Sequence, residues 1–387
     1  MTKYSCPYDP FTSVRKEQGI HLGTFNGEKI PMILRPKDIK AAAMDTETFS
    51  SDTPYRVPIP SEEEVRKYRQ LPIETNPPEH TDYRNLIEPL FRRPAKREFI
   101  ARIEALITDQ LNAALAAGEA IEVVSEFSLP LQCKALTLLL NVPMSESERW
   151  LRWGMNVFTG ENRVEKGSQL EQYLDEKFTQ ALADEPGDDF FSILAHAELK
   201  GRRLTKDEMM GYGNLAFAGG RDTVINMVTA VVGYLAEHPD DLVRLRETPK
   251  LANTAAEEFA RVVSPVGHIG RTCPAGATVA GHTIEPGQRV ALTWGAANFD
   301  ESVFEDPEKI RLDRKPNPHI AYGFGAHTCI GATHARTIIR TLFKVLSEHL
   351  ERIEFIECTQ NREAGPNLDR HAPYDTLTVR FMSRNQP

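Results

Sequence analysis

The sequence lacks the features that define several large classes of protein. Its 5 cysteines are widely scattered among 387 residues and form no CxxC pair, so neither a disulfide framework nor a zinc cage is indicated. The longest apolar stretches, such as 137–143 and 224–236, are too short or too interrupted to cross a bilayer. No signal for secretion is recognised. We therefore expect a cytoplasmic protein that contacts no membrane.

The sequence also lacks the excess of positive charge that nucleic-acid binding requires, because its formal net charge is −9. A hydrophobic share of 41% and a charged share of 26% are typical of a globular protein with a sizeable core. No clear linker, internal repeat or low-complexity tract divides the chain. We expect residues 1–387 to form a single domain, and the protein to be a monomer.

What the sequence does contain is mainly helical patterning. Residues 80 to about 264 carry apolar side chains at helical spacing. One long helix is predicted from about Lys206 to Glu237, and another from about Leu251 to Val263. A helix opened by Pro36 and a short charged helix within the Pro-rich residues 51–79 are also expected.

The C-terminal third has a different texture. Residues 266–330 alternate small β-forming residues with Gly and Pro, which indicates short hairpins and irregular loops. A last strong helix is predicted to start near Cys329, because Ala335, Ile338 and Leu342 belong to one apolar stripe. The predicted layout is mainly α with minor β.

The most informative segment is AYGFGAHTCIGATHAR, residues 321–336, in which Cys329 lies among glycines directly before an amphipathic helix. Gly323, Gly325 and Gly331 allow tight turns and the close approach of a flat ligand, while N–H groups near a helix N-terminus lower a thiol pKa. This context favours a thiolate ligand, although a free cysteine is usually a small buried hydrophobe.

His334 forms a Cys-x4-His pair with Cys329, a spacing that could suggest zinc. No other ligands lie nearby in the sequence. His334 is therefore interpreted as structural.

Two adjacent glycines interrupt the helical run LAFAGGRDTVINM at residues 215–227, at a cost of about 1 kcal/mol each relative to alanine. The missing side chains at Gly219 and its neighbour would open a groove for a flat cofactor and a small ligand. Thr223 could bond back to the carbonyl of residue 219. Asp222 and Thr223 could hold and pass protons there. The alternative is a Gly pair that only permits close helix packing.

Two further pairs of charged residues attract attention. His80 and Arg84 lie one turn apart on one helical face, and a cationic pair that faces inward requires anions. Glu258 and Arg261 lie three residues apart, where a charge pair forms readily. Taken alone, each pair is more often solvated at the surface, where an ion pair contributes about 0.5 kcal/mol.

In these blocks, and in their order along the chain, the sequence resembles the cytochrome P450 family. The segment around Cys329 is similar to the family's haem-binding signature, with Tyr322 where the usual residue is Phe. Residues 258–261 match its Glu-x-x-Arg motif. The run GG-x-DTV-x-N at residues 219–226 resembles the camphor-hydroxylating bacterial members especially closely. The resemblance covers nearly the whole chain, from the CPYDP opening at residues 6–10 onward.

The resemblance implies a triangular, mainly α haem protein with small β-sheets, and haem b as the cofactor. Cys329 would be the axial ligand of the haem iron. Thr223 would hydrogen-bond the reacting dioxygen, and Asp222 would belong to the relay that delivers protons for O–O cleavage. The resemblance implies three further roles. The residues implied to contact the haem are His80, Arg84, Arg271, His327 and Gly331. Those implied to line the substrate pocket are Leu215, Ala218, Gly219, Gly267 and His268, with the loop from about 54 to 74, and those implied to brace the haem loop are Glu258, Arg261 and Arg314.

The implied activity is that of a haem-thiolate monooxygenase, which inserts one oxygen atom from O2 into a small organic substrate by hydroxylation or oxidative O-demethylation. A peroxide-dependent peroxygenase and a non-enzymatic haem sensor are the alternatives, and the Asp222-Thr223 pair favours O2 activation. Small terpenoids are the first expected substrates. Compact oxygenated or methoxylated compounds, including methyl sugars, are the second, since Gly267 and His268 favour a somewhat polar ligand.

No G-x-G-x-x-G fingerprint for a flavin or nicotinamide accompanies the chain, so electrons must come from a separate protein. The bacterial relatives pair with acidic ferredoxins, and we expect a ferredoxin with its reductase. Its predicted docking site is a basic face formed by Arg336, Arg340 and Lys344, with a second basic group at residues 92–97. The alternative is that these residues form solvated helix faces.

Overall fold

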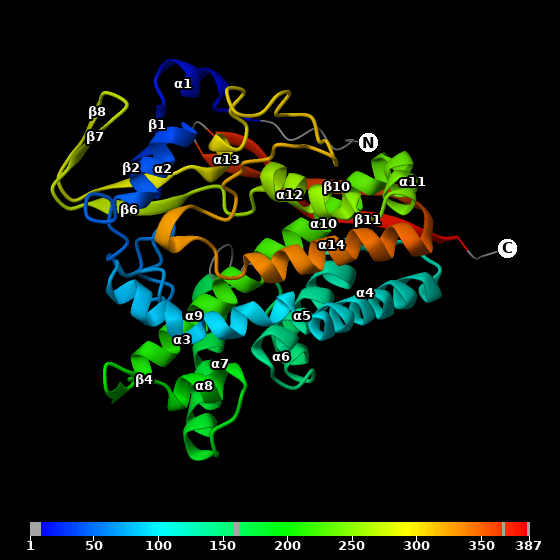
Figure 1. Ribbon diagram of the computed structural model, residues 1–387, viewed down its shortest axis with the longest axis horizontal. Coiled ribbons are helices and arrows are strands. Elements are labelled where there is room, and N and C mark those ends of the chain that lie inside the picture. The colour runs from blue at the N-terminus through cyan, green and yellow to red at the C-terminus, as the bar shows by residue number, and fades with distance from the viewer. Residues whose placement is uncertain (1–8, 156, 158–161, 366–367, 385–387) are drawn as a thin grey trace.

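The computed structural model describes residues 9–155, 157, 162–365 and 368–384, so residues 6–8 of the opening motif lie outside the described part. Helices make up most of it, and the strands β1, β2, β6, β7 and β8 lie together at one end of the molecule (Figure 1). The predicted mainly α fold with minor β is confirmed.

Local sequence signals explain where many of the helices begin. The helix α9 starts with a capping box, in which the Thr205 side chain accepts the N–H of Glu208 and the Glu208 side chain accepts the N–H of Thr205. Pro36 opens α2. The helices are α1 (Thr12–Glu17), α2 (Pro36–Met44), α3 (Glu79–Arg92), α4 (Arg97–Ala117), α5 (Leu129–Leu140), α6 (Glu146–Arg152), α7 (Arg163–Ala183), α8 (Phe190–His196), α9 (Lys206–Gly220), α10 (Asp222–Glu237), α11 (Pro239–Glu247), α12 (Leu251–Val263), α13 (Trp294–Ala297) and α14 (Ala332–His349), with the short turns η1 (Arg93–Ala95), η2 (Val123–Ser128) and η3 (Gly325–His327).

The strands form small sheets. One has the order β1-β2-β9-β6, in which β2 and β9 run parallel and the other pairs are antiparallel. A second has the order β10-β11-β3, and β4-β5 and β7-β8 are separate antiparallel pairs. The strands are β1 (Ile20–Phe25), β2 (Glu28–Ile33), β3 (Ile121–Glu122), β4 (Glu198–Leu199), β5 (Arg202–Arg203), β6 (Ile269–Cys273), β7 (Ala277–Val279), β8 (His282–Ile284), β9 (Gln288–Leu292), β10 (Leu350–Gly365) and β11 (Leu368–Ser383).

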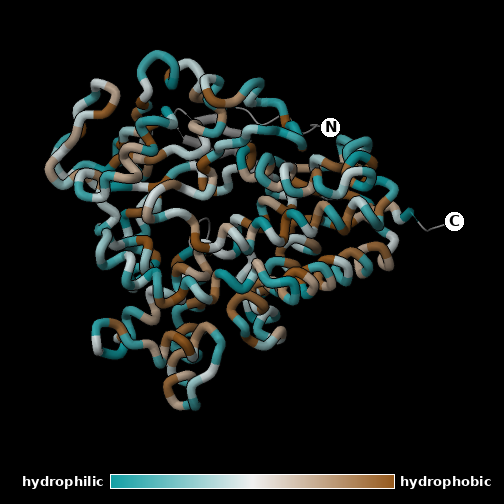
Figure 2. The backbone as a smooth tube through the Cα atoms, in the orientation of Figure 1, coloured by the Kyte–Doolittle hydropathy of each residue, from teal (hydrophilic) through white to brown (hydrophobic). Residues whose placement is uncertain are grey.

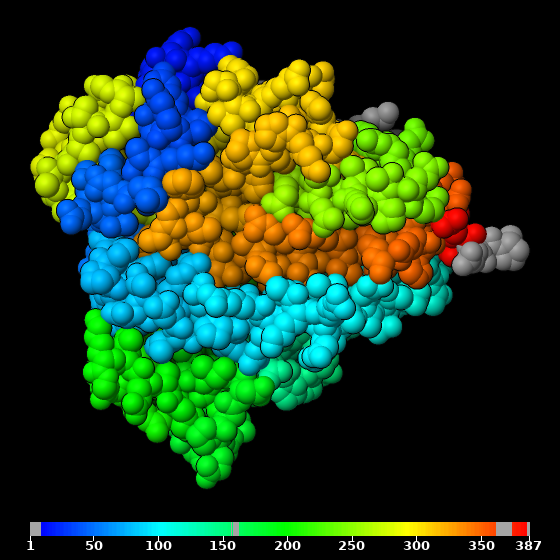
Figure 3. Space-filling model, in the orientation of Figure 1, coloured from blue at the N-terminus to red at the C-terminus, as the bar shows by residue number. Residues whose placement is uncertain are grey.

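The helix α14 lies at the centre of the helical part, where it packs against α4 and α12. Its predicted apolar stripe is buried, including Ile338, Leu342 and Leu346. Brown and teal segments alternate along these helices in Figure 2, as expected of helices with one apolar face. In Figure 3 the orange band of α14 lies between α12 and α4. The helix that follows Cys329 is therefore fixed by the core on several sides.

One apolar stretch, Val123–Leu140, is long enough to cross a membrane, but 78% of it is buried inside the protein. Burial of this kind is typical of a core helix. It comprises η2 and α5.

The predicted helix from Lys206 to Glu237 is wrong in one respect, because it is broken at Arg221 (φ −107°, ψ −79°) into α9 and α10. Gly219 and Gly220 favour the break through their low helix propensity. The Thr223 hydroxyl strengthens it by donating a hydrogen bond to the Gly219 carbonyl (2.9 Å).

The short charged helix expected within residues 51–79 does not form, since residues 51–78 contain turns and bends only. The buried Glu74 carboxylate accepts the backbone N–H groups of Tyr55 (2.9 Å) and Gln70 (2.8 Å) and the guanidinium of Arg66. These bonds compete with helix formation and fold the loop around one carboxylate.

Candidate active site

A cavity lies between α9, α10, α3 and the loop that carries Cys329, with about 1650 Å³ of free space including its open mouth. Its walls are predominantly apolar and include the predicted pocket residues Leu215, Ala218 and Gly219. From the loop predicted at 54–74, Leu71, Pro72 and Ile73 reach the wall. A flat apolar ligand therefore has room beside the Cys329 loop.

Tight turns hold Cys329 in this wall. Its N–H donates to the carbonyl of Tyr322 (2.7 Å), and Gly323 and Gly325 have the left-handed φ values of +75° and +76°. A Cβ added at Gly325 would lie 2.7 Å from the carbonyl oxygen of Ala43, so this glycine is required.

The Cys329 side chain is accessible from the cavity, although protein surrounds it on the other sides. Burial raises the pKa of the Cys329 thiol, and the backbone N–H of Gly331 and the charge of Arg84 oppose this only in part. Binding to a metal would displace the thiol proton. The thiol is therefore suited to become a ligand once a cation is present.

Four predicted contacts of the cofactor meet at one side of this cavity: His80, Arg84, Arg271 and His327. The rings of His80 and His327 lie 4.2 Å apart. Burial, helped by the charges of Arg84 and Arg271, lowers the pKa of His80 to about 4, and burial with the charge of Arg271 lowers that of His327 to about 2. Burial alone lowers the pKa of Arg271 to about 10.

This cluster lacks an anion among the residues that the structure describes. Both ring nitrogens of His327 and the Nδ1 atom of His80 are buried without a hydrogen-bond partner. The Arg271 guanidinium bonds only the carbonyl of Gly270 (2.7 Å), and Arg84 bonds the carbonyl of Thr328 (2.7 Å). Buried cations and polar atoms without partners are costly, so they fit a ligand that brings carboxylates. The site therefore fits a haem, with its two propionates at this side.

The break between α9 and α10 forms another part of the wall. Thr223 lines the cavity, and a Cβ added at Gly219 would meet no atom within 4 Å, so the glycine leaves open space. Asp222 is the first residue of α10, next to Thr223, but it does not line the cavity. Of the two predicted proton-handling residues, only Thr223 therefore reaches the cavity directly.

Two predicted pocket residues lie elsewhere. Within the described cavity wall, Val266 and Ile269 are present and Gly267 and His268 are not. Gly267 is buried and its carbonyl accepts the N–H of Gly295 (2.9 Å), while the His268 ring packs on Phe25 of β1. The polar-ligand expectation based on these two residues is therefore corrected, since the Gly267 carbonyl is bonded to Gly295 and the His268 ring lies against β1.

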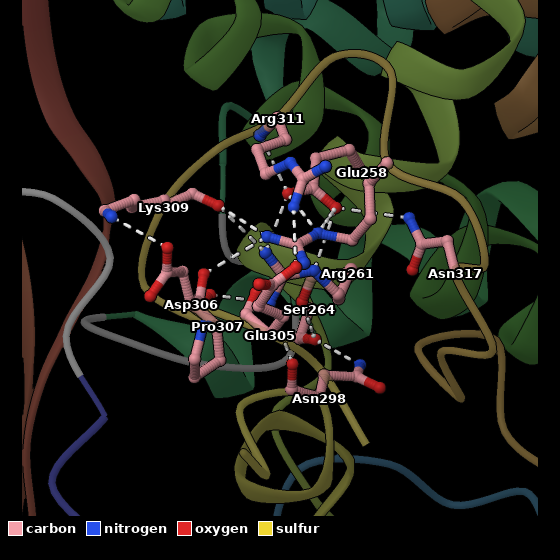
Figure 4. Close-up of polar contacts among 11 residues, drawn as sticks. Glu258, Arg261, Ser264, Asn298, Glu305, Asp306, Pro307, Lys309, Arg311 and Asn317 are labelled. Atoms are coloured by element: carbon pink, nitrogen blue, oxygen red, sulfur yellow. Dashed lines mark hydrogen bonds and ion pairs between the residues drawn. The ribbon is translucent and has the colours of Figure 1, made fainter. Parts of the chain in front are cut away.

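The predicted brace is a buried network around Glu258 (Figure 4). Its carboxylate accepts from Arg261 (2.8 and 2.9 Å) and from Arg314 (2.9 and 3.0 Å), and all three side chains are almost fully buried. Arg261 also donates to the carbonyls of Asn298 and Pro307. The network thus ties α12 to the chain that leads toward Cys329, and the alternative of a solvated surface pair is wrong.

The basic face predicted for docking is largely neutralised. Glu257 accepts hydrogen bonds from Arg336 (2.9 Å) and Arg340 (2.9 Å), and Lys344 pairs with Glu104 (2.6 Å). Arg336 and Arg340 therefore form ion pairs with Glu257 of α12 and are less available to a partner protein. The sequence interpretation overlooked Glu257 because only the tertiary structure brings α12 against α14.

Among the residues that the structure describes, no group of three or more His, Cys, Asp or Glu side chains could hold a metal ion. His334 is buried and neither of its ring nitrogens has a hydrogen-bond partner. Its ring packs edge-on against Phe99. This surrounding agrees with a structural histidine and gives the zinc interpretation no further ligand.

Sequence reasoning also missed Arg221 and Gln132, which hold the break between the two helices. Gln132 of α5 donates to the carbonyl of Gly220. Arg221 is buried and donates to the carbonyls of Trp150 (3.1 Å) and Gly154 (2.8 Å). The only sequence signal was a charged residue directly after the glycines of an otherwise apolar run.

Comparison with known proteins agrees with this geometry. The family model described as Cytochrome P450 matches residues 249–367. The chain is 30% identical to the steroid C26-monooxygenase of Rhodococcus jostii (strain RHA1) over 90% of this chain and 77% of that protein. It is 28% identical to the linalool 8-monooxygenase of Pseudomonas putida over 94% and 93%.

Among solved structures, a protein described as a carbohydrate active P450 superimposes with a TM-score of 0.94 at 40% identity, covering 98% of this chain and 100% of that one. The chain therefore belongs to the cytochrome P450 family, whose members are haem-iron oxidoreductases, and its relatives are monooxygenases.

Proposed function

We propose that this protein is a haem b monooxygenase that removes the methyl group of a small methoxylated carbohydrate. The observation that carries the oxygenase part is the accessible Cys329 thiol in a cavity that also contains Thr223, the cations Arg84 and Arg271, and ring nitrogens of His80 and His327 that lack a hydrogen-bond partner within the described chain. The carbohydrate part rests on the 40% identity to the protein described as a carbohydrate active P450. We infer that the enzyme acts in the cytoplasm.

Bound haem would supply the activation of O2, and the Cys329 thiolate would hold its iron. The net reaction is R–OCH3 + O2 + 2 electrons + 2 protons → R–OCH2OH + H2O, and the hemiacetal then collapses to R–OH and formaldehyde. His80, Arg84, Arg271 and His327 would hold the propionates. The apolar wall beside Gly219 suits a methyl group better than a hydroxyl group.

Thr223 and Asp222 are proposed to manage the protons of this reaction. The Thr223 hydroxyl already donates to the Gly219 carbonyl, so its oxygen remains free to accept and pass a proton at the cavity wall. Asp222 lies one residue away and does not line the cavity, so it would act through a relay rather than by direct contact. A peroxygenase would need neither residue. The likeness to camphor-hydroxylating members rests on this motif and is also only a proposal.

The electron donor is proposed to be a ferredoxin with its reductase. Because Arg336 and Arg340 are bound to Glu257, the more available cations of the predicted basic faces are Lys96 and Arg97, which are exposed. A docking site centred on the start of α4 is therefore favoured over the original one on α14.

The first test is the absorption spectrum of the reduced protein with carbon monoxide, compared with Cys329→Ser. A strongly red-shifted, thiolate-type Soret band that is lost in Cys329→Ser supports the oxygenase assignment. A histidine-type band, or no bound haem, would refute it. The wild-type enzyme should then release formaldehyde in proportion to a methyl sugar consumed, with reductase and ferredoxin present.

A second candidate is hydroxylation of a small terpenoid. It is favoured by the apolar cavity wall and by the 28% identity to a linalool 8-monooxygenase. Titration of the haem spectrum with linalool and with a methyl hexoside distinguishes the two, because only the true substrate class should shift the Soret band at low concentration.

A further inference from the structure

Arg221 is the single residue between α9 and α10, and only 1% of its surface is exposed. A buried guanidinium is costly unless its surroundings require the charge. Its Nε and Nη1 atoms have no hydrogen-bond partner among the described residues. Two of the three guanidinium nitrogens of Arg221 are therefore unsatisfied within the described chain, and the contacts of the third, Nη2, must account for its presence.

Those contacts reach the end of α6. The Nη2 atom of Arg221 donates to the carbonyls of Trp150 (3.1 Å) and Gly154 (2.8 Å), and the guanidinium lies 5.8 Å from the ring centre of Trp153. Gly154 has φ +62°, a left-handed conformation that turns its carbonyl away from a regular helix. One side chain thus bonds two carbonyls where α6 ends, those of Trp150 and Gly154.

The helix break is held from a second side as well. Gln132 of α5 donates to the carbonyl of Gly220, the residue before Arg221. On the other side, the N–H groups of Val224 and Ile225 donate to the Arg221 carbonyl. The conformation of residue 221 is therefore fixed by α5, α6 and the first turn of α10 together.

Thr223 and Asp222 follow directly after this fixed residue. The hydrogen bond of the Thr223 hydroxyl to the Gly219 carbonyl spans the break (2.9 Å). A shift of residue 221 must therefore move Thr223 relative to Gly219 and the cavity. Since both residues lie within the first turn of α10, they cannot adjust independently.

We propose that Arg221 is a positioning residue for oxygen activation, which anchors the α9–α10 break to the end of α6 and so sets the orientation of Thr223 and Asp222. The inference rests on the proposed oxygenase function. Correct positioning directs two electrons, two protons and O2 to one oxygenated product and one water. Misplaced proton donors allow the same electrons and protons to leave as H2O2 instead.

The experiment compares Arg221→Met and Arg221→Lys with the wild-type haem-loaded enzyme. Methionine keeps similar length but removes the charge and the donors, whereas lysine keeps the charge. We expect Arg221→Met to raise the share of electrons released as H2O2 several-fold, and Arg221→Lys to raise it less. Substrate affinity, read from the haem spectrum, should stay within about twofold, because Arg221 itself does not line the cavity.

Arg289→Met is the matched control. Arg289 is also 1% exposed and donates to two backbone carbonyls, those of Arg56 and Pro58, but it lies in β9 and away from the break. We expect this variant to lose thermal stability without a change in the share of H2O2. The contrast separates positioning from the general cost of removing a buried arginine.

The double variant Arg221→Met/Thr223→Ala distinguishes a positioning role of Arg221 from a merely structural one. If Arg221 acts through Thr223, the double variant should release no more H2O2 per electron than Thr223→Ala alone. The proposal would be overturned if the two substitutions raised the release of H2O2 additively. It would also be overturned if folded Arg221→Met released the same share of electrons as H2O2 as the wild type. If Arg221→Met does not fold, the proposal is overturned when Arg221→Lys releases the same share of electrons as H2O2 as the wild type. Absence of the thiolate band in the wild type would instead defeat the proposed function.

Discussion

His334 is a buried histidine whose two ring nitrogens make no hydrogen bond within the described chain. Burial lowers its pKa from 6.5 to about 4. Because an unfolded chain takes up a proton near pH 6.5 and the folded one does not until about pH 4, this residue makes the folded state progressively less stable as the pH falls through that window. His334 lies at the edge of the cavity, and its burial without hydrogen bonds to the described residues costs stability.

We therefore predict that His334→Leu raises the free energy of unfolding by about 1 kcal/mol at pH 7, because it removes unsatisfied polar atoms from an apolar site. The gain should increase as the pH is lowered from 6.5 to 4. Thermal unfolding across that range measures it, and the thiolate-type carbon monoxide spectrum is the control. A loss of stability, or a changed spectrum, would contradict the structural interpretation of His334.

Gly219 and Gly325 are both in the site but serve different needs. Gly325 has a left-handed φ and a carbonyl 2.7 Å from where a Cβ would lie, whereas a Cβ at Gly219 would enter open space. We predict that Gly219→Ala stabilises the protein by up to about 1 kcal/mol through helix propensity. The same methyl group should weaken substrate binding because it takes room in the cavity.

The thermal midpoint and a spectral titration with substrate measure the two effects of Gly219→Ala. Gly325→Ala is the comparison, and it should lose stability and haem together. Unchanged substrate affinity in Gly219→Ala would show that Gly219 does not face the bound substrate.

At the scale of elements, the basic groups at α14 and at the start of α4 can be separated experimentally. We predict that Lys96→Glu with Arg97→Glu slows reduction by an acidic ferredoxin, most strongly at low salt, because exposed charges steer encounter. Stopped-flow reduction at several salt concentrations measures it. Lys29→Glu makes the same kind of charge change in β2 and should have little effect.

Equal slowing by Lys29→Glu would indicate a general charge effect rather than docking. Reversing Arg336 and Arg340 is a poor test of docking by comparison. It would place new carboxylates beside Glu257 and lower stability through like-charge repulsion.

Sequence periodicity predicted most elements well. The helix expected from Leu251 to Val263 has those bounds, and the stripe of α14 is buried as expected. The break at Arg221 was not predicted, because it depends on the side-chain amide of Gln132 in α5, which donates to the Gly220 carbonyl, and on carbonyls at the end of α6. The helix expected within 51–79 fails to form for a similar reason. The Glu74 carboxylate accepts N–H groups from Tyr55 and Gln70, and no local sequence pattern predicts these bonds.

The site was predicted to the extent that it follows motifs. Cys329, Thr223, the arginines Arg84 and Arg271 and the histidines His80 and His327 meet at one cavity because each motif is fixed to a regular element. Gly267 and His268 fall outside the wall since their orientation depends on how the chain enters β6. That residues 1–387 form one domain stays a prediction.

At the scale of the whole molecule, buried carboxylates set the acid limit of stability. Burial would raise the pKa of Glu257, but hydrogen bonds from His319 and Arg336 lower it to about 2. The pKa of Glu258 is also lowered, against the effect of burial, by Arg261. Carboxylates with lowered pKa values stabilise the folded state above their ordinary pKa near 4.5, and this contribution is lost as the pH falls toward 2.

We predict that Glu257→Gln lowers the free energy of unfolding by about 1–3 kcal/mol at pH 7, since it removes a charged acceptor from several donors. The difference from the wild type should shrink as the pH falls from 4.5 toward 2. Thermal midpoints measured over this range check it. A difference that does not depend on pH would mean that the Glu257 carboxylate is not the stabilising group.

The order in which the site's parts are made has a consequence for how the enzyme is loaded. Arg84 and His80 are synthesised early, and the groove at Gly219 midway, but the thiol of Cys329 and the helix α14 that fixes it come late. Chains generally fold from the N-terminus during synthesis. Iron can therefore be captured by its thiolate only after α14 has emerged from the ribosome. Until haem is bound, the cavity beside Cys329 is open and apolar and contains the Arg84 and Arg271 cations, so a shortage of haem would leave the protein exposed to aggregation and proteolysis.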